Sequence, residues 1–181
     1  KLAGLQHGGV LAGMLTVAGL TMGIGGPVLG SLKVWTTLGC LGSALALLAI
    51  ATGGLAGADF PLRVPVFALG LFNGIFAVAA IGSMMALAGA GGEAERGTRM
   101  GVWGAAQGVA FGAGGFLGTV AVDLARLVTP RVVDAYASVF AAEALLFVFA
   151  AALALRIAHA PATQVPRGRR QIGRASCRER V

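Results

Sequence analysis

Residues 64–92 read VPVFALGLFNGIFAVAAIGSMMALAGAGG and contain no Asp, Glu, Lys or Arg. A helix needs about 20 apolar residues to cross the hydrocarbon core of a bilayer, and this stretch is long enough. Backbone polar groups cannot stay unsatisfied in lipid, so a spanning segment must be a helix or part of a closed barrel. The stretch lacks the period-two alternation of a barrel strand. It therefore predicts a transmembrane helix.

Four further stretches have the same character. The first three contain no charged residue, and in the last Glu143 is the one charged residue before Arg156; they are 8–32, 34–58, 100–122 and 135–156. The chain is 57% hydrophobic and only 12% charged, about half the charge of a soluble domain. Its 30 glycines would weaken soluble helices but allow membrane helices to approach closely. We therefore predict an all-α membrane protein with five transmembrane helices.

The predicted bundle occupies residues 1–160, and a basic tail follows at 161–170. Residues 171–181 read QIGRASCRERV and resemble the translation of a sequencing adapter, so we exclude them from the fold. The chain begins at Lys1 rather than Met, and we expect it to be a fragment of a protein that extends upstream. The distribution of Lys and Arg among the connections and the tail predicts a cytoplasmic C-terminus.

Polar residues at membrane depth are candidates for function, because burying them is costly unless they are paired. Three with an amide or carboxyl side chain occur within the predicted spans: Asn73, Gln107 and Glu143. One hypothesis is hydrogen bonding between helices, with Asn73 paired to Gln107. The other is contact with a substrate or pigment. A transporter could use Glu143 for proton exchange, and a pigment carrier could use such an oxygen to bind magnesium in a chlorin ring.

Two further features are candidate contacts. His7 precedes the first apolar stretch, where it would be either an interfacial polar residue or a ligand to pigment. Between residues 97 and 115, glycines recur every three or four residues and so share one helix face, close to Trp103. That stripe predicts either a helix–helix seam or a smooth groove for a flat ligand or a partner helix; it comprises Gly97, Gly101, Gly104, Gly108, Gly112 and Gly115.

Residues for catalysis do not cluster along the sequence. The two histidines, His7 and His159, are far apart, and no Cys or His group has the spacing of a metal site. We therefore expect no enzyme activity, no covalent cofactor, no metal site and no nucleic-acid partner. The basic tail is expected to meet membrane lipid.

A family resemblance rests mainly on residues 96–108, RGTRMGVWGAAQG, and 111–118, FGAGGFLG. Shorter similar strings are GLFNGIF at 70–76, GSMM at 82–85 and VFAAEALLF at 139–147. Together they resemble the PucC/LhaA family, which lies within the major facilitator superfamily.

The resemblance implies that these five helices are the last five of a twelve-helix bundle. It also implies an assembly factor in the inner membrane of a phototrophic bacterium. Such a factor would deliver bacteriochlorophyll, bound as a transient ligand, to light-harvesting antenna polypeptides or chaperone them. The alternative is a secondary transporter of a small solute, in which Glu143 or Asn73 would line a central path.

Overall fold

The chain forms five helices in a computed structural model that describes residues 1–23, 31–57, 59–89 and 93–158. The helices are α1 (Leu2–Gly23), α2 (Leu32–Ala56), α3 (Arg63–Gly89), α4 (Glu93–Val128) and α5 (Val132–Ala158). No strand occurs among the described residues. By length and composition, α2, α3, α4 and α5 can each cross a membrane. The prediction of an all-α membrane protein is confirmed.

The helices differ in length from the predicted apolar spans. Helix α1 begins at Leu2, while residues 24–30 of the first predicted span lie outside the described residues. Helix α4 has 36 residues, which corresponds to about 54 Å, and it includes the charged residues on both sides of the span 100–122. The predicted tail 161–170 and the segment 171–181 also lie outside the described residues.

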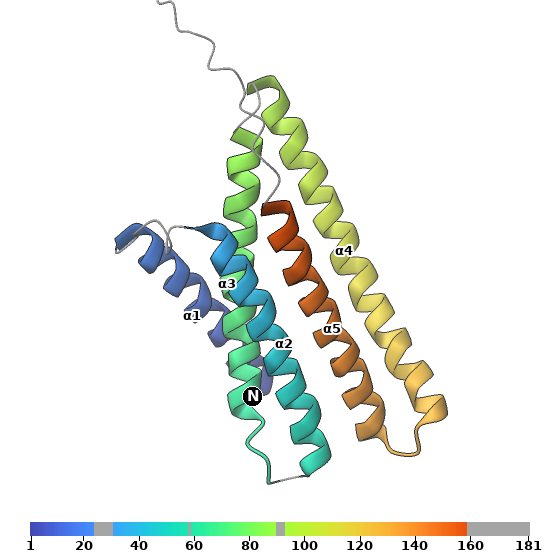
Figure 1. The fold of residues 1–181 in the computed structure, drawn as a ribbon. Helices are drawn as coiled ribbons and strands as arrows, with labels where there is room; N and C mark the ends of the chain where they lie inside the picture. Colours follow the sequence, from blue (N-terminus) through green and yellow to red (C-terminus); the bar gives the residue numbers. More distant parts are fainter. Residues whose placement is uncertain (24–30, 58, 90–92, 159–181) are drawn as a thin grey trace, which may run out of the picture.

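The core of the molecule lies where α2 contacts α3 on one side and α5 on the other. Figure 1 shows α2, α3 and α5 running side by side, with α1 crossing α3. One buried cluster joins α1, α2 and α3, and a second joins α2 and α5. The first comprises Val17, Trp35, Ile75 and Ala79, and the second comprises Ala44, Leu47 and Ala144.

Glycines allow α1 and α3 to approach at backbone distance. A Cβ atom added at Gly13 would collide with the carbonyl oxygen of Leu71 and lie 3.0 Å from the amide nitrogen of Ile75. On the opposite side of the contact, Cβ atoms at Gly70 and Gly74 would collide with α1 carbonyl oxygens. The crossing of α1 and α3 therefore requires glycine, as in other close contacts between membrane helices.

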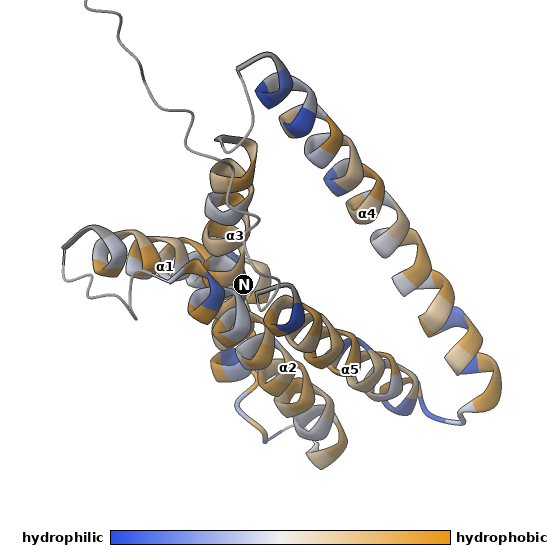
Figure 2. Ribbon diagram, turned by 45° about the horizontal axis from the view of Figure 1, so that its top comes forward, coloured by the Kyte–Doolittle hydropathy of each residue, from blue (hydrophilic) through white to orange (hydrophobic). Residues whose placement is uncertain are grey.

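Helix α4 diverges from this packed group (Figures 1 and 2). No residue of α4 from Glu95 to Val128 is buried. At its start, Arg99 forms an ion pair of 2.8 Å with Glu95 and donates a hydrogen bond of 3.2 Å to the carbonyl oxygen of Leu87 in α3. At its other end, a turn of three residues leads into α5, so the two helices are antiparallel neighbours.

Candidate functional site

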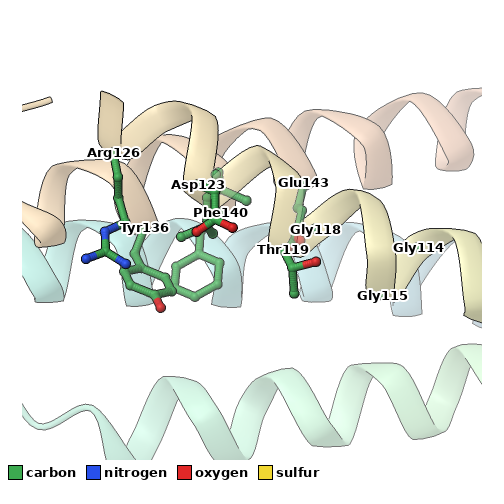
Figure 3. A pocket seen from close by; sticks show the side chains of 11 residues that line it. Gly114, Gly115, Gly118, Thr119, Asp123, Arg126, Tyr136, Phe140 and Glu143 are labelled. Atoms are coloured by element: carbon green, nitrogen blue, oxygen red, sulfur yellow. The ribbon is translucent and has the colours of Figure 1, made fainter. Parts of the chain in front are cut away.

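A groove of about 480 Å³ lies between the second half of α4 and the first half of α5. Its volume falls within the range of about 300–1,000 Å³ that is usual for ligand pockets. Figure 3 shows its side chains. The lining residues are Gly114, Gly115, Gly118, Thr119, Val122, Asp123, Arg126, Tyr136, Val139, Phe140 and Glu143.

Helical spacing explains why these residues share one groove. On α4, Gly115, Thr119, Val122 and Arg126 follow one another at three or four residues, and residues so spaced share a helix face. On α5 the same spacing links Tyr136, Phe140 and Glu143. The rings of Tyr136 and Phe140 pack with their centroids 6.2 Å apart. The short turn between the helices brings the two faces together.

The groove changes in character along its length. Figure 3 shows Arg126, Tyr136 and Asp123 toward one end and Gly115 and Gly114 at the other. Val122, Val139 and Phe140 make much of its wall apolar. The groove therefore suits a molecule with an apolar body and polar groups at one end.

Glu143 lies along this groove and is partly buried. Among the described residues it forms neither a hydrogen bond nor an ion pair. It faces Gly118 across the groove, where an added Cβ would lie 3.9 Å from Glu143 Oε1. A carboxylate within a membrane helix is costly without a partner, so Glu143 stays a predicted contact.

Asn73 forms a hydrogen bond between helices, as one hypothesis predicted, but its partner is Ser43 and not Gln107. Its Oδ1 accepts a hydrogen bond of 2.9 Å from Ser43 Oγ, and Ser43 is fully buried. No hydrogen bond joins Asn73 and Gln107 in the part of the chain that the structure describes. The bond instead ties α3 to α2, because these two helices are in direct contact.

His7 lies on the exposed side of α1, away from the groove. Its Nδ1 is 2.7 Å from the carbonyl oxygen of Ala3 in the same helix, so Nδ1 is the donor. His7 does not line the groove, and its contact with a pigment stays a prediction. Cys40 is buried and free, as expected for a packing residue.

Trp103 and Gln107 do not line the groove but lie on the same helix. Both are partly buried, together with Met100 one turn earlier, whereas the other residues of 95–117 are exposed. The spacing of three and four residues places this row on the side of α4 that is turned toward the rest of the protein.

The glycine stripe of α4 has no partner among the described residues. A Cβ at any one of its six positions would meet no atom within 4 Å. Gly115 belongs both to this stripe and to the groove. The stripe is thus an accessible surface in this chain, and what covers it stays a prediction.

Four polar or aromatic groove residues were not predicted as contacts: Thr119, Asp123, Arg126 and Tyr136. Asp123 and Arg126 follow the predicted span 100–122 but still belong to α4. The missing signal was the three-to-four-residue spacing on each side of a short turn, since helices joined by such a turn are adjacent.

Comparison with known proteins adds two findings. Residues 1–162 match the family described as "PUCC protein", which confirms the family resemblance predicted from the sequence. The chain is also 54% identical, over 168 residues, to the "Bacteriochlorophyll synthase 44.5 kDa chain" of Rhodobacter capsulatus. The match covers 92% of this chain but 38% of that relative. No solved structure matches the chain.

Proposed function

Because this chain belongs to the PUCC protein family, we propose that the protein containing it carries bacteriochlorophyll within the membrane and delivers it to light-harvesting antenna polypeptides. The observation that carries the proposal is the 54% identity to a relative named for bacteriochlorophyll. This chain spans 38% of that relative's length, so the proposal concerns the whole protein. The alternative form of this role is to chaperone the antenna polypeptides without carrying their pigment.

The groove supports this proposal through its chemistry. Bacteriochlorophyll has a flat, largely apolar ring with polar groups at its edge and a magnesium ion at its centre. The groove has an apolar wall, polar groups toward one end and two carboxylates, Asp123 and Glu143, that have no partner among the described residues. A ligand that stays in the membrane can enter a site between two transmembrane helices without passing through water, and ligand sites often lie between the helices of a bundle.

The glycine stripe supports the second half of the proposal. Its six positions carry no side chain that would keep another helix at a distance, and no described helix covers them. Rows of small residues are the usual contact surface between membrane helices. We therefore assign the stripe to the antenna polypeptide, next to the groove that holds its pigment.

The proposed role is not enzymatic, although the relative is named a synthase chain. A carrier releases the pigment that it received, whereas an enzyme would change it. Mass spectrometry of the pigment before and after incubation with the protein separates the two roles. Recovery of a chemically altered pigment would overturn the carrier role.

The proposed orientation places the first turn of α4 on the cytoplasmic side of the inner membrane. Arg96 and Arg99 lie there, close to the end of α3. Lys and Arg near the ends of membrane helices favour the cytoplasm. Arg126 and Arg131 lie at the opposite end, but Arg156, Arg167, Arg169 and Arg170 in the sequence give the majority to the side of Arg96 and Arg99. In this orientation the C-terminus is also cytoplasmic, and the polar end of the groove faces the periplasm. Labelling of single cysteines placed at Arg96 and Arg126 in intact cells tests this arrangement.

The first test is a near-infrared absorption spectrum of the full-length protein, purified in mild detergent from a host that makes bacteriochlorophyll. Delivery predicts a stoichiometric bacteriochlorophyll band and co-purification of antenna polypeptides. Antenna polypeptides without pigment would reduce the role to that of a chaperone for protein. If neither is bound, the delivery function is wrong and transport of a small solute becomes the better hypothesis.

A further inference from the structure

Two carboxylates line the groove, Asp123 and Glu143, and neither forms a hydrogen bond or an ion pair among the described residues. Asp123 is exposed, whereas Glu143 is partly buried and lies farther from the end of its helix. Asn73 Oδ1 already accepts a hydrogen bond from Ser43, and His7 Nδ1 is bonded to its own helix. Trp103 and Gln107 lie outside the groove. Of the five residues that the sequence nominated as contacts, Glu143 is therefore the one that lines this groove among the described residues.

We propose that Glu143 binds the central magnesium ion of a bacteriochlorophyll held in the α4–α5 groove. This inference rests on the proposed function and deepens it, because it names the atom of the protein that recognises the pigment. The pigment is cargo here, and its magnesium arrives and leaves with it.

The chemistry of the pair favours this assignment. Magnesium is a hard cation that prefers oxygen ligands, and a carboxylate is among the strongest of these. A carboxylate in an apolar groove is poorly solvated, so contact with a cation offsets a cost that the protein already carries. A pigment without magnesium cannot provide that compensation.

The surroundings of Glu143 keep the carboxylate accessible. The opposite wall has glycine at 114, 115 and 118, so the α4 backbone itself forms the surface there. A side chain at Gly118 would begin 3.9 Å from Oε1 and would occupy the space beside the carboxylate. A flat ring can therefore reach Glu143 from the open side of the groove.

The polar end of the groove fits the edge of the same ring. Arg126 and Tyr136 both line it, and each can donate hydrogen bonds to the carbonyl and ester oxygens of a bacteriochlorophyll. Tyr136 and Glu143 are seven residues apart in α5, which is about two helical turns, and Figure 3 shows Arg126 beside Tyr136. Metal contact and edge contact are therefore made by different residues.

The test compares two pigments in the full-length protein. Bacteriopheophytin has the ring of bacteriochlorophyll with two protons in place of magnesium. Each pigment is titrated in mild detergent into the wild type, Glu143→Leu, Glu143→Gln and Gly118→Leu, with the absorption band of bound pigment as the measurement. Glu95→Gln, which removes an exposed carboxylate outside the groove, is the matched control.

The wild type should bind bacteriochlorophyll more tightly than bacteriopheophytin. Glu143→Leu should weaken bacteriochlorophyll binding by at least about tenfold, as loss of a ligand does at metal sites, and leave bacteriopheophytin binding unchanged. Glu143→Gln keeps an oxygen and should fall between. Gly118→Leu should weaken both pigments, because it fills the groove. Glu95→Gln should behave as the wild type.

Different failures have different meanings. Equal weakening of both pigments by the Glu143 variants would overturn magnesium binding while leaving delivery intact. So would equal binding of the two pigments by the wild type, a result that needs no variant to fold. If the wild type binds neither pigment, the delivery function itself is wrong, and the inference fails with it.

Discussion

The α1–α3 crossing and the α4 stripe both contain glycines at similar spacing, but only the crossing is a helix contact among the described residues. Gly9 and Gly13, four residues apart in α1, lie against the backbone of α3, and a Cβ at either would collide with it. Gly104 and Gly108, also four residues apart, have nothing within 4 Å of an added Cβ. The spacing thus predicts that a close contact can form. It does not reveal whether the partner belongs to the same chain.

The largest expected effect comes from filling the α1–α3 contact. Gly13→Ala in the full-length protein should lower the free energy of unfolding by about 1–3 kcal/mol, because the new methyl group meets backbone that cannot rotate away. Gly8→Ala, on an open part of the same helix, should be neutral or slightly stabilising since Ala favours helix. Thermal unfolding in detergent measures both. Equal stability of the two variants would contradict the close crossing.

The α4 stripe should respond in the opposite way. Replacing Gly104 and Gly108 by Leu should leave unfolding of the full-length protein within about 0.5 kcal/mol of the wild type, as at other exposed sites. The yield of assembled antenna complex should nevertheless fall, because the new side chains keep the antenna helix at a distance. The yield is measured from the near-infrared bands of membranes. Unchanged yield at a normal protein level would overturn the proposed contact between the stripe and the antenna helix. Loss of the protein itself would instead indicate that the stripe packs against another helix of the same protein.

The same contrast separates the two polar groups that lie in α3 and α5. Asn73 is engaged by Ser43 within the packed helices, while Glu143 faces the groove. Asn73→Ala should destabilise the protein by about 1–2 kcal/mol, because Ser43 then loses its partner in a buried position. Pigment binding should stay unchanged. Denaturant unfolding and pigment titration of the same samples provide the two measurements.

A double-variant cycle sharpens this result. If the Ser43–Asn73 bond is the main contribution, Ser43→Ala combined with Asn73→Ala should cost less than the sum of the single variants. Additive effects would show that the two residues act independently. Weakened pigment binding in a well-folded Asn73→Ala protein would instead indicate that Asn73 contacts the pigment.

The helices were predictable because their cause is local. Runs without charge, such as residues 64–92, mark a membrane helix without knowledge of its neighbours. The length of α4 was not predicted, because the predicted span 100–122 includes only uncharged residues. Glu95 and Arg99 lie before it, yet both are helical and form an ion pair along the helix. Charge marks where a helix leaves lipid, and the helix itself can continue into water.

The site was only partly predictable for a different reason. Glu143 was identified because a carboxylate in an apolar run is rare. Tyr136 and Arg126 were not, since they are ordinary residues near helix ends until α4 and α5 are seen to be adjacent. The partner of Asn73 was missed likewise, because Ser43 is one of several serines and its position opposite Asn73 depends on how α2 packs on α3.

The smallest expected effect concerns Arg99, which links the start of α4 to the end of α3. Arg99 reaches from α4 to the carbonyl oxygen of Leu87 in α3 and pairs with Glu95, but both charged side chains are exposed. Exposed pairs of this spacing contribute about 0.3–0.5 kcal/mol, so Arg99→Gln should barely change thermal unfolding. If α4 is held near α3 mainly by this link, the distance between spin labels placed at Leu87 and Val102 should broaden in the variant. An unchanged distance distribution would mean that Met100, Trp103 and Gln107 hold this half of α4 in place. In that case its stripe faces outward because of packing, and the charged link contributes nothing to it.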